Sequence, residues 1–86
     1  MAKTIYRDSY RALIGLLRAR REELGMTQAA AAALVGWSQQ TYSGVETCTR
    51  RVDVIEYFWI ARKLGMDVDR VFRAVSDAIQ ALDSCA

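Results

Sequence analysis

Apolar residues recur along the chain at the three- and four-residue spacing of amphipathic helices, and glycines separate the segments. The first apolar stripe consists of Tyr6, Tyr10, Leu13, Ile14, Leu17 and Leu24, and Gly25 follows it. This spacing places side chains on one helical face, and glycine readily adopts the left-handed backbone that ends helices. The pattern therefore predicts a first helix from about Tyr6 to Glu23.

Two short helices are expected next. Thr27 is a suitable N-cap for a helix over 28–35, which Gly36 ends, and Ser38 is a suitable N-cap for a helix over 39–47. Because only a short turn at Gly36 and Trp37 joins them, they form a helix-turn-helix unit.

The pattern predicts two further helices, over 53–64 and 68–82. Asp53 is the N-cap of the first and Gly65 its terminator. One of its apolar stripes consists of Val54, Tyr57, Ile60, Ala61 and Leu64, and a second of Ile55, Phe58 and Trp59 with Arg62. A helix that is apolar on two sides is central or shared between chains. Trp59 with its stripe is therefore expected either in the core under the last helix or on a dimer surface.

The last segment has heptad spacing that suits a docking or dimerisation helix. Its apolar residues are Val68, Val71, Phe72, Val75, Ala78, Ile79 and Leu82. With 86 residues, no proline and five glycines, the chain is expected to form one all-α domain over 1–86. The helical core is expected over 6–66 and the docking helix over 68–83.

Charge and chemistry narrow the function classes. Residues 1–21 carry six basic residues against one acidic residue, which is compatible with phosphate binding. The chain has no histidine, and its two cysteines, Cys48 and Cys85, are far apart. These residues offer no zinc site and no acid–base constellation, so we expect no metal, no cofactor and no enzyme. Without a signal peptide or an apolar run of membrane-spanning length, we expect a cytoplasmic protein with reduced thiols.

Several motifs between about residues 13 and 71 together are similar to those of a known family. They are Arg21, Leu24-Gly25-Met26-Thr27-Gln28, Gly36-Trp37-Ser38-Gln39, Tyr42-Ser43, Val45-Glu46, Arg50-Arg51 and Ile60-Ala61-Arg62-Lys63-Leu64-Gly65. In this order and spacing the sequence resembles the Cro and phage-repressor (XRE) helix-turn-helix family. The resemblance implies a compact five-helix, lambda-repressor-like domain with its helix-turn-helix in the second and third helices. It also implies sequence-specific binding of double-stranded DNA by a transcriptional regulator, which we expect to be a repressor.

The third predicted helix carries the expected base contacts: Gln39, Gln40, Ser43 and Gly44. Glutamine presents a donor and an acceptor together, and it pairs with adenine in the major groove. The resembling family inserts this end of the helix into the groove. Gly44 departs from the family, which often has a long polar side chain there. The alternative is that these glutamines only solvate a surface turn.

Phosphate contacts are expected around the same helix. They are Thr27, Gln28, Ser38, Thr47, Thr49, Arg50 and Arg51. Helix N-termini and arginines suit phosphate binding, which positions a protein without reading sequence. The alternatives are an ordinary helix start at 27–28 and a solvated loop at 50–51.

Two charged residues are expected to be structural. Arg21 lies on the apolar stripe, where an unpaired charge is costly. The resemblance implies a buried ion pair between Arg21 and Glu46. Cys48 stands where the family often has glycine, so we expect a strained backbone or a different turn there.

The expected partners are DNA and a second copy of the chain. The candidate dimer surfaces are Ile55, Phe58 and Trp59, or Val71, Val75, Ile79 and Leu82, or both sets. The alternative function is an antitoxin-like or other protein-interaction module with the same fold and weak or no DNA binding.

Overall fold

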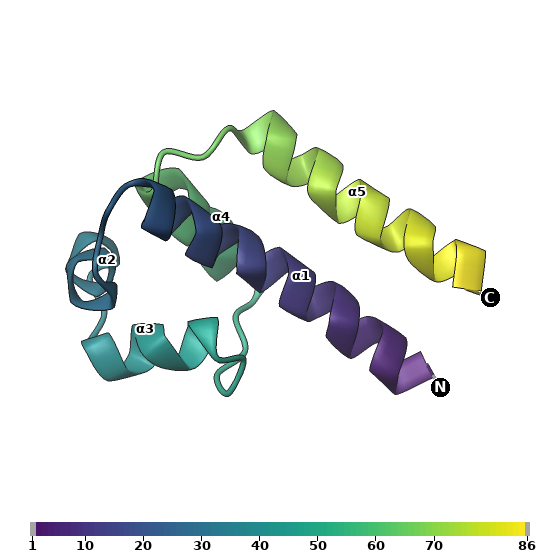
Figure 1. Ribbon diagram of the computed structural model, residues 1–86, viewed down its shortest axis with the longest axis horizontal. Coiled ribbons are helices and arrows are strands. Elements are labelled where there is room, and N and C mark those ends of the chain that lie inside the picture. The colour runs from purple at the N-terminus through teal and green to yellow at the C-terminus, as the bar shows by residue number, and fades with distance from the viewer. Residues whose placement is uncertain (1, 86) are drawn as a thin grey trace.

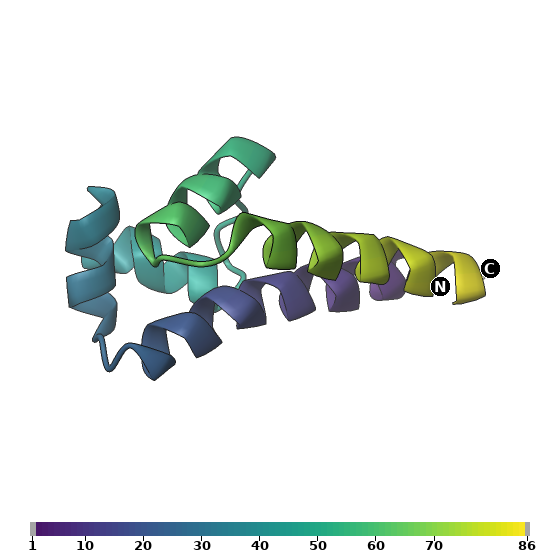
Figure 2. The same cartoon turned by 90° about the horizontal axis from the view of Figure 1, so that it is seen from above.

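A computed structural model describes the backbone of residues 2–85 and the side chains of residues 7–81. It contains α1 (Ala2–Glu23), α2 (Gln28–Val35), α3 (Gln39–Glu46), α4 (Val54–Lys63) and α5 (Val68–Cys85). The long helices α1 and α5 lie side by side with both chain ends at one end of the molecule, and α2, α3 and α4 gather at the other (Figures 1 and 2). The expected all-α, five-helix fold is confirmed. None of the helices in the described part is long and apolar enough to cross a membrane.

The two long helices extend beyond the predicted limits. α1 begins at Ala2 rather than near Tyr6, and α5 runs to Cys85 rather than ending near Leu82. No glycine or proline interrupts either extension, and an established helix adds residues more easily than a new one starts. The side chains of Tyr6 and Leu82 lie outside the described residues.

All five helices contribute side chains to one core. Its largest fully buried side chains are Tyr42, Ile14, Leu17, Ile60, Leu64, Val45 and Val71. Leu24, expected on the buried stripe, is 43% exposed because α1 ends one residue earlier and the chain turns away. Val71 was expected on a dimer surface, but it is only 1% exposed in the chain's own core. That prediction is wrong, since a side chain already buried has no surface to offer a partner.

Side chains cap the three shorter helices at the predicted positions. The Thr27 side chain accepts a hydrogen bond from the Ala30 backbone amide, and the Ser38 side chain accepts one from the Thr41 backbone amide. Asp53 and Glu56 each accept the other's backbone N–H in a capping box. Gly36 ends α2 with φ of 83°, a conformation that costs glycine little. Caps and terminator together fix the short turn between α2 and α3.

Trp59 joins α4 to α2. Its indole Nε1 donates to the Val35 carbonyl oxygen at 3.2 Å, and the Lys63 ammonium lies 4.6 Å from a ring centroid. The ring is 44% exposed. The expectation that it lies in the core under the last helix is therefore wrong, because the residue stays exposed and its indole N–H bonds to the end of α2.

Helix α3 ends in a Schellman motif centred on Cys48. The Thr49 amide donates to the Gly44 carbonyl at 2.9 Å, and the Cys48 amide donates to the Val45 carbonyl at 3.1 Å. Cys48 has φ of 63°, in the left-handed region where a Cβ crowds the backbone. Among the described residues it is the one non-glycine residue with positive φ. The expected backbone strain is therefore present at this position.

We predict that Cys48→Gly stabilises the fold relative to Cys48→Ala by about 1 kcal/mol, since glycine relieves the left-handed strain and alanine retains it. Both variants remove the half-buried thiol, so the difference between their free energies of unfolding reports the backbone strain at residue 48. Urea denaturation of the pair measures it. Equal midpoints for the two variants would show that the strain is absorbed elsewhere.

Candidate nucleic-acid interface

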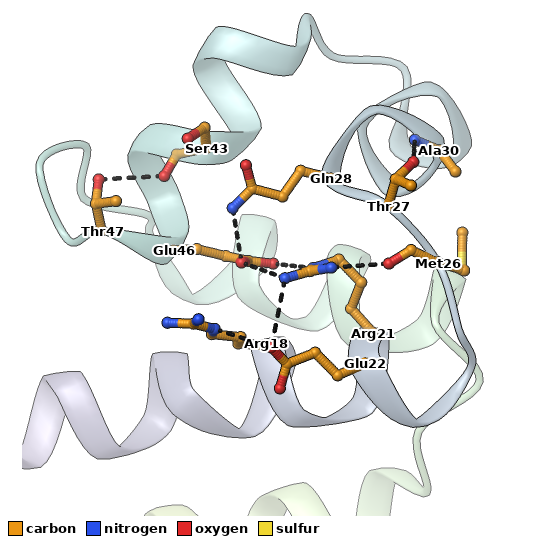
Figure 3. A network of polar contacts seen from close by, with 10 residues as sticks. All are labelled: Arg18, Arg21, Glu22, Met26, Thr27, Gln28, Ala30, Ser43, Glu46 and Thr47. Carbon is orange, nitrogen blue, oxygen red and sulfur yellow. Dashed lines mark hydrogen bonds and ion pairs between the residues drawn. The ribbon is translucent and has the colours of Figure 1, made fainter.

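A buried ion pair joins the first helix to the third. The Arg21 Nε donates to Glu46 Oε2 at 2.7 Å and its Nη2 to Glu46 Oε1 at 3.0 Å, in a two-bond fork (Figure 3). The two side chains are 10% and 2% exposed. A paired geometry of this kind is what makes a buried charge tolerable. The pair fixes α3 against the long helix α1.

The same carboxylate also holds the second helix. The Gln28 Nε2 donates to Glu46 Oε1 at 3.0 Å, and the Arg21 Nη1 donates to the Met26 carbonyl at 2.7 Å. Figure 3 shows Gln28 and Arg21 approaching Glu46 from different elements. One carboxylate thus ties α1, the turn after it, the start of α2 and the end of α3 into one unit.

Electrostatics keep this carboxylate ionised. Burial acts to raise the pKa of Glu46, but hydrogen bonds from Arg21 and Gln28 outweigh it, so the pKa lies below its ordinary value. The Arg21 pKa is raised by its hydrogen bond to Glu46. Burial and the nearby Glu46 raise the pKa of the Tyr42 phenol, so this hydroxyl stays neutral.

The outer face of α3 forms a shallow hollow. It is lined by Gln39, Gln40, Ser43, Gly44, Thr47 and Thr49. Gln39 and Gln40 are exposed in the first turn, and Ser43 is half-exposed one turn later. All six lining residues are uncharged, and five of them carry a side-chain hydroxyl or amide. The face therefore offers hydrogen-bond donors and acceptors in place of charge.

Gly44 lies where the loop after α3 folds back on the helix. A Cβ built there would lie 3.3 Å from the Arg50 Cβ and 3.3 Å from the Thr49 Oγ1. The Gly44 carbonyl also accepts the Thr49 and Arg50 amides, at 2.9 and 3.0 Å. This close approach explains why a long polar side chain is missing at this position, and it leaves Gly44 only its backbone to present to a ligand.

The expected phosphate contacts fall into two groups. Thr27 and Ser38 lie at the N-termini of α2 and α3, and Gln28 follows Thr27 with its amide turned toward Glu46. Thr47 and Thr49 lie beyond the far end of α3, where their hydroxyls are 3.0 Å apart. The hydroxyls therefore flank the α3 hollow at both ends.

The two arginines of the loop take different positions. The Arg51 guanidinium lies 4.3 Å from the centroid of the Tyr10 ring, and the side chain is exposed. The Arg50 guanidinium lies 4.7 Å from a Trp37 ring centroid, and its Nη2 donates to Glu56 Oε2 at 3.1 Å. Arg51 is thus accessible to a ligand, whereas Arg50 is held by contacts within the chain.

Sequence reasoning missed the aromatic and acidic partners of this loop. Tyr10 supports Arg51 and accepts the Val52 amide on its hydroxyl at 3.1 Å, while Trp37 and Glu56 hold Arg50. The Asp53–Glu56 spacing of a capping box could have identified Glu56, but nothing in the sequence links Trp37 to Arg50. No group of three metal-ligating side chains occurs among the described residues.

The comparisons with known proteins agree with this architecture. A helix-turn-helix family model matches residues 17–71. Among solved structures, the chain is similar to an XRE-family like protein from Pseudomonas syringae pv. tomato str. DC3000, with 35% sequence identity and a TM-score of 0.77. That similarity covers 92% of this chain and 93% of the other. A search of the curated proteins found no match.

Fold and site together define a DNA-binding helix-turn-helix domain of the lambda-repressor-like type. The chain belongs to the XRE helix-turn-helix family, a non-enzymatic family of DNA-binding domains.

We predict that Glu46→Gln destabilises the fold by about 3–5 kcal/mol at neutral pH, because it leaves the Arg21 charge buried without its counter-charge. The folded-state pKa of Glu46 is lowered, so its stabilising contribution is complete above the ordinary glutamate pKa and is lost as the pH falls through the folded value. The difference between wild type and variant should therefore shrink on acidification from about pH 7 to about pH 3. Urea denaturation at both pH values measures it.

Glu23→Gln is the matched control for this prediction. Its side chain is 68% exposed and its carboxylate pairs with Arg20, so its loss should cost under about 1 kcal/mol at either pH. A Glu46 variant as stable as the Glu23 variant would refute the role of the buried pair.

Proposed function

We propose that this protein binds double-stranded DNA sequence-specifically, with the first turn of α3 in the major groove, and represses transcription. The observation that carries the proposal is the exposed pair Gln39 and Gln40 at the capped N-terminus of α3, with Ser43 on the same face. Amide side chains can pair bidentately with adenine in the groove. The buried Arg21–Glu46 pair supports the proposal because it fixes the direction in which α3 points.

Phosphate contacts in this proposal surround the hollow. They are Thr27, Gln28, Ser38, Thr47, Thr49 and Arg51, with Gly44 forming part of the hollow itself. Hydroxyls and N-terminal amides hold phosphate without reading sequence, and Arg51 adds a full charge. Arg50 was expected in this group, but its contacts with Trp37 and Glu56 support a different role.

We predict that the wild type binds DNA from upstream of its own gene at least about a thousandfold more tightly than a shuffled fragment. Gln40→Ala should reduce that preference by about tenfold to a hundredfold, because it removes a bidentate base contact. Arg51→Gln should weaken binding to both fragments alike and reduce the salt slope by about 0.9, as expected for one phosphate contact. Fluorescence anisotropy at several salt concentrations measures all three.

Arg62→Gln, an exposed change on α4, is the matched control for charge loss. A reporter driven by the bound fragment tests repression, which should disappear in Gln40→Ala. Equal binding of native and shuffled fragments by the wild type would refute groove reading. The antitoxin-like alternative would then be favoured by copurification of a monomer with one neighbour-encoded protein.

The proposal includes a homodimer, because one short recognition helix makes few base contacts and two half-sites supply useful specificity. Large apolar side chains remain exposed on two helices: Ile55 on α4 is 77% exposed, and Phe72 and Ile79 on α5 are 68% and 55% exposed. Of the other expected dimer contacts, Phe58 and Val75 are half-buried and Trp59 is tied to α2.

We predict a dimer in sedimentation equilibrium, and we predict that a charge in the interface dissociates it. Ile55→Glu and Ile79→Glu test the two candidate surfaces separately, since each places a carboxylate where apolar contact is expected. The variant in the true interface should sediment as a monomer, whereas the other should remain a dimer. A monomeric wild type at micromolar concentration, with specific DNA binding intact, would refute this part of the proposal.

A further inference from the structure

Arg50 contacts three parts of the DNA-reading unit at once. Its backbone amide donates to the Gly44 carbonyl of α3 at 3.0 Å. Its guanidinium lies 4.7 Å from a ring centroid of Trp37, the residue directly before the N-cap of α3. Its Nη2 donates at 3.1 Å to Glu56 in the first turn of α4. One residue therefore connects the turn before α3 and the helix that follows through its side chain, and α3 itself through its backbone amide.

Two further observations show that neighbouring residues are arranged to hold Arg50 in this position. Gly44 of α3 has no Cβ, and a Cβ there would lie 3.3 Å from the Arg50 Cβ. The loop that carries Arg50 can therefore lie directly against α3. Glu56 is itself held by the Asp53 amide at 3.0 Å, so its carboxylate is in place to receive the guanidinium. The side chains of Arg50 and Glu56 are 39% and 32% exposed, which leaves the ion pair partly shielded from water.

We propose that Arg50 is a positioning residue for DNA reading, which sets the placement of α3 through Trp37 and Glu56, and is not a phosphate contact. This inference rests on the proposed function. A planar guanidinium can stack on a ring face while its edge donates to a carboxylate, and the compact ammonium of lysine cannot reproduce both contacts. The residue thereby influences which bases Gln39 and Gln40 meet, although it touches none of them.

The substitution Arg50→Lys separates the two roles because it retains the positive charge. A phosphate contact would survive it nearly intact, and only Arg50→Gln would weaken binding to all DNA and reduce the salt slope by about 0.9. A positioning residue would already fail in Arg50→Lys. We expect about a tenfold loss of affinity for the native fragment, with the affinity for the shuffled fragment and the salt slope unchanged.

Glu56→Gln provides an independent variant on the other side of the contact. Glutamine keeps an oxygen to accept the Asp53 amide, so the capping box of α4 is retained while the charge that holds Arg50 is removed. We expect the same selective loss for the native fragment as in Arg50→Lys. Arg62→Lys, the same chemical change at an exposed position of α4, is the control and should bind both fragments as the wild type does.

A readout that does not use DNA accompanies these measurements. In the free protein, the Trp37 indole N–H resonance should shift in Arg50→Lys and in Glu56→Gln. Backbone amide resonances of α5 serve as an internal reference, because the contacts of Arg50 and Glu56 lie with α3, α4 and the turn before α3. Amide exchange at Thr49 and Arg50, the two donors to the Gly44 carbonyl, should also accelerate in both variants.

The outcomes separate this inference from the function on which it rests. Selective loss of native-fragment affinity together with the Trp37 shift supports the positioning role. An unchanged Trp37 resonance and unchanged amide exchange in Arg50→Lys overturn it, whatever the DNA result. A wild type without fragment preference refutes DNA reading, and the role of Arg50 in it, even if the Trp37 shift shows that the contact itself exists. If Arg50→Lys binds DNA as the wild type does and Arg50→Gln reduces the salt slope, Arg50 contacts phosphate and the positioning role is refuted.

Discussion

The arrangement of the helix-turn-helix unit depends on one buried carboxylate. Glu46 on α3 receives two hydrogen bonds from Arg21 on α1 and one from Gln28 on α2, so its carboxylate joins three helices. The short helices α2 and α3 have eight residues each, too few to be stable alone in water. They are therefore stabilised by contacts with each other and with the longer helices, and the apolar core alone fixes direction less strictly than a forked ion pair does.

A second constraint acts on the opposite flank of α3. Two backbone amides of the loop after this helix donate hydrogen bonds to the Gly44 carbonyl, and the Val52 amide donates to the Tyr10 hydroxyl. The Arg50 side chain contacts Trp37 and Glu56. The left-handed Cys48 is what allows the chain to reverse so soon after α3 ends. Helix α3 is thus held by α1 through Glu46, and by α4 and Tyr10 through the loop that follows it, while its outer face stays open.

Much of this architecture could be predicted from local signals. N-caps at Thr27, Ser38 and Asp53 and terminating glycines act within a few residues, so the limits of α2, α3 and α4 follow from the sequence closely. For contacts between distant segments, the apolar stripe indicated only that Arg21 needs a counter-charge, and the family resemblance supplied Glu46 as its partner. The positions of Trp59 and Arg50 could not be predicted in this way, because an aromatic ring and an arginine fit many surroundings, and only the packing of α2 and α4 selects one. Val71 was misplaced for a related reason, since an apolar stripe does not say which part of it meets its own chain.

The uncharged hollow on α3 has a consequence for the salt dependence of binding in the proposed complex. Counterion release makes the part of the DNA affinity that comes from cations fall steeply with salt, whereas hydrogen bonds between uncharged groups release no counterions. The residues that line the hollow are uncharged, and Arg51 is the exposed cation of the loop that follows. Added salt should therefore weaken the affinity for every DNA sequence alike, and it should leave the ratio of affinities for two different sequences largely unchanged, because that ratio depends on the hollow.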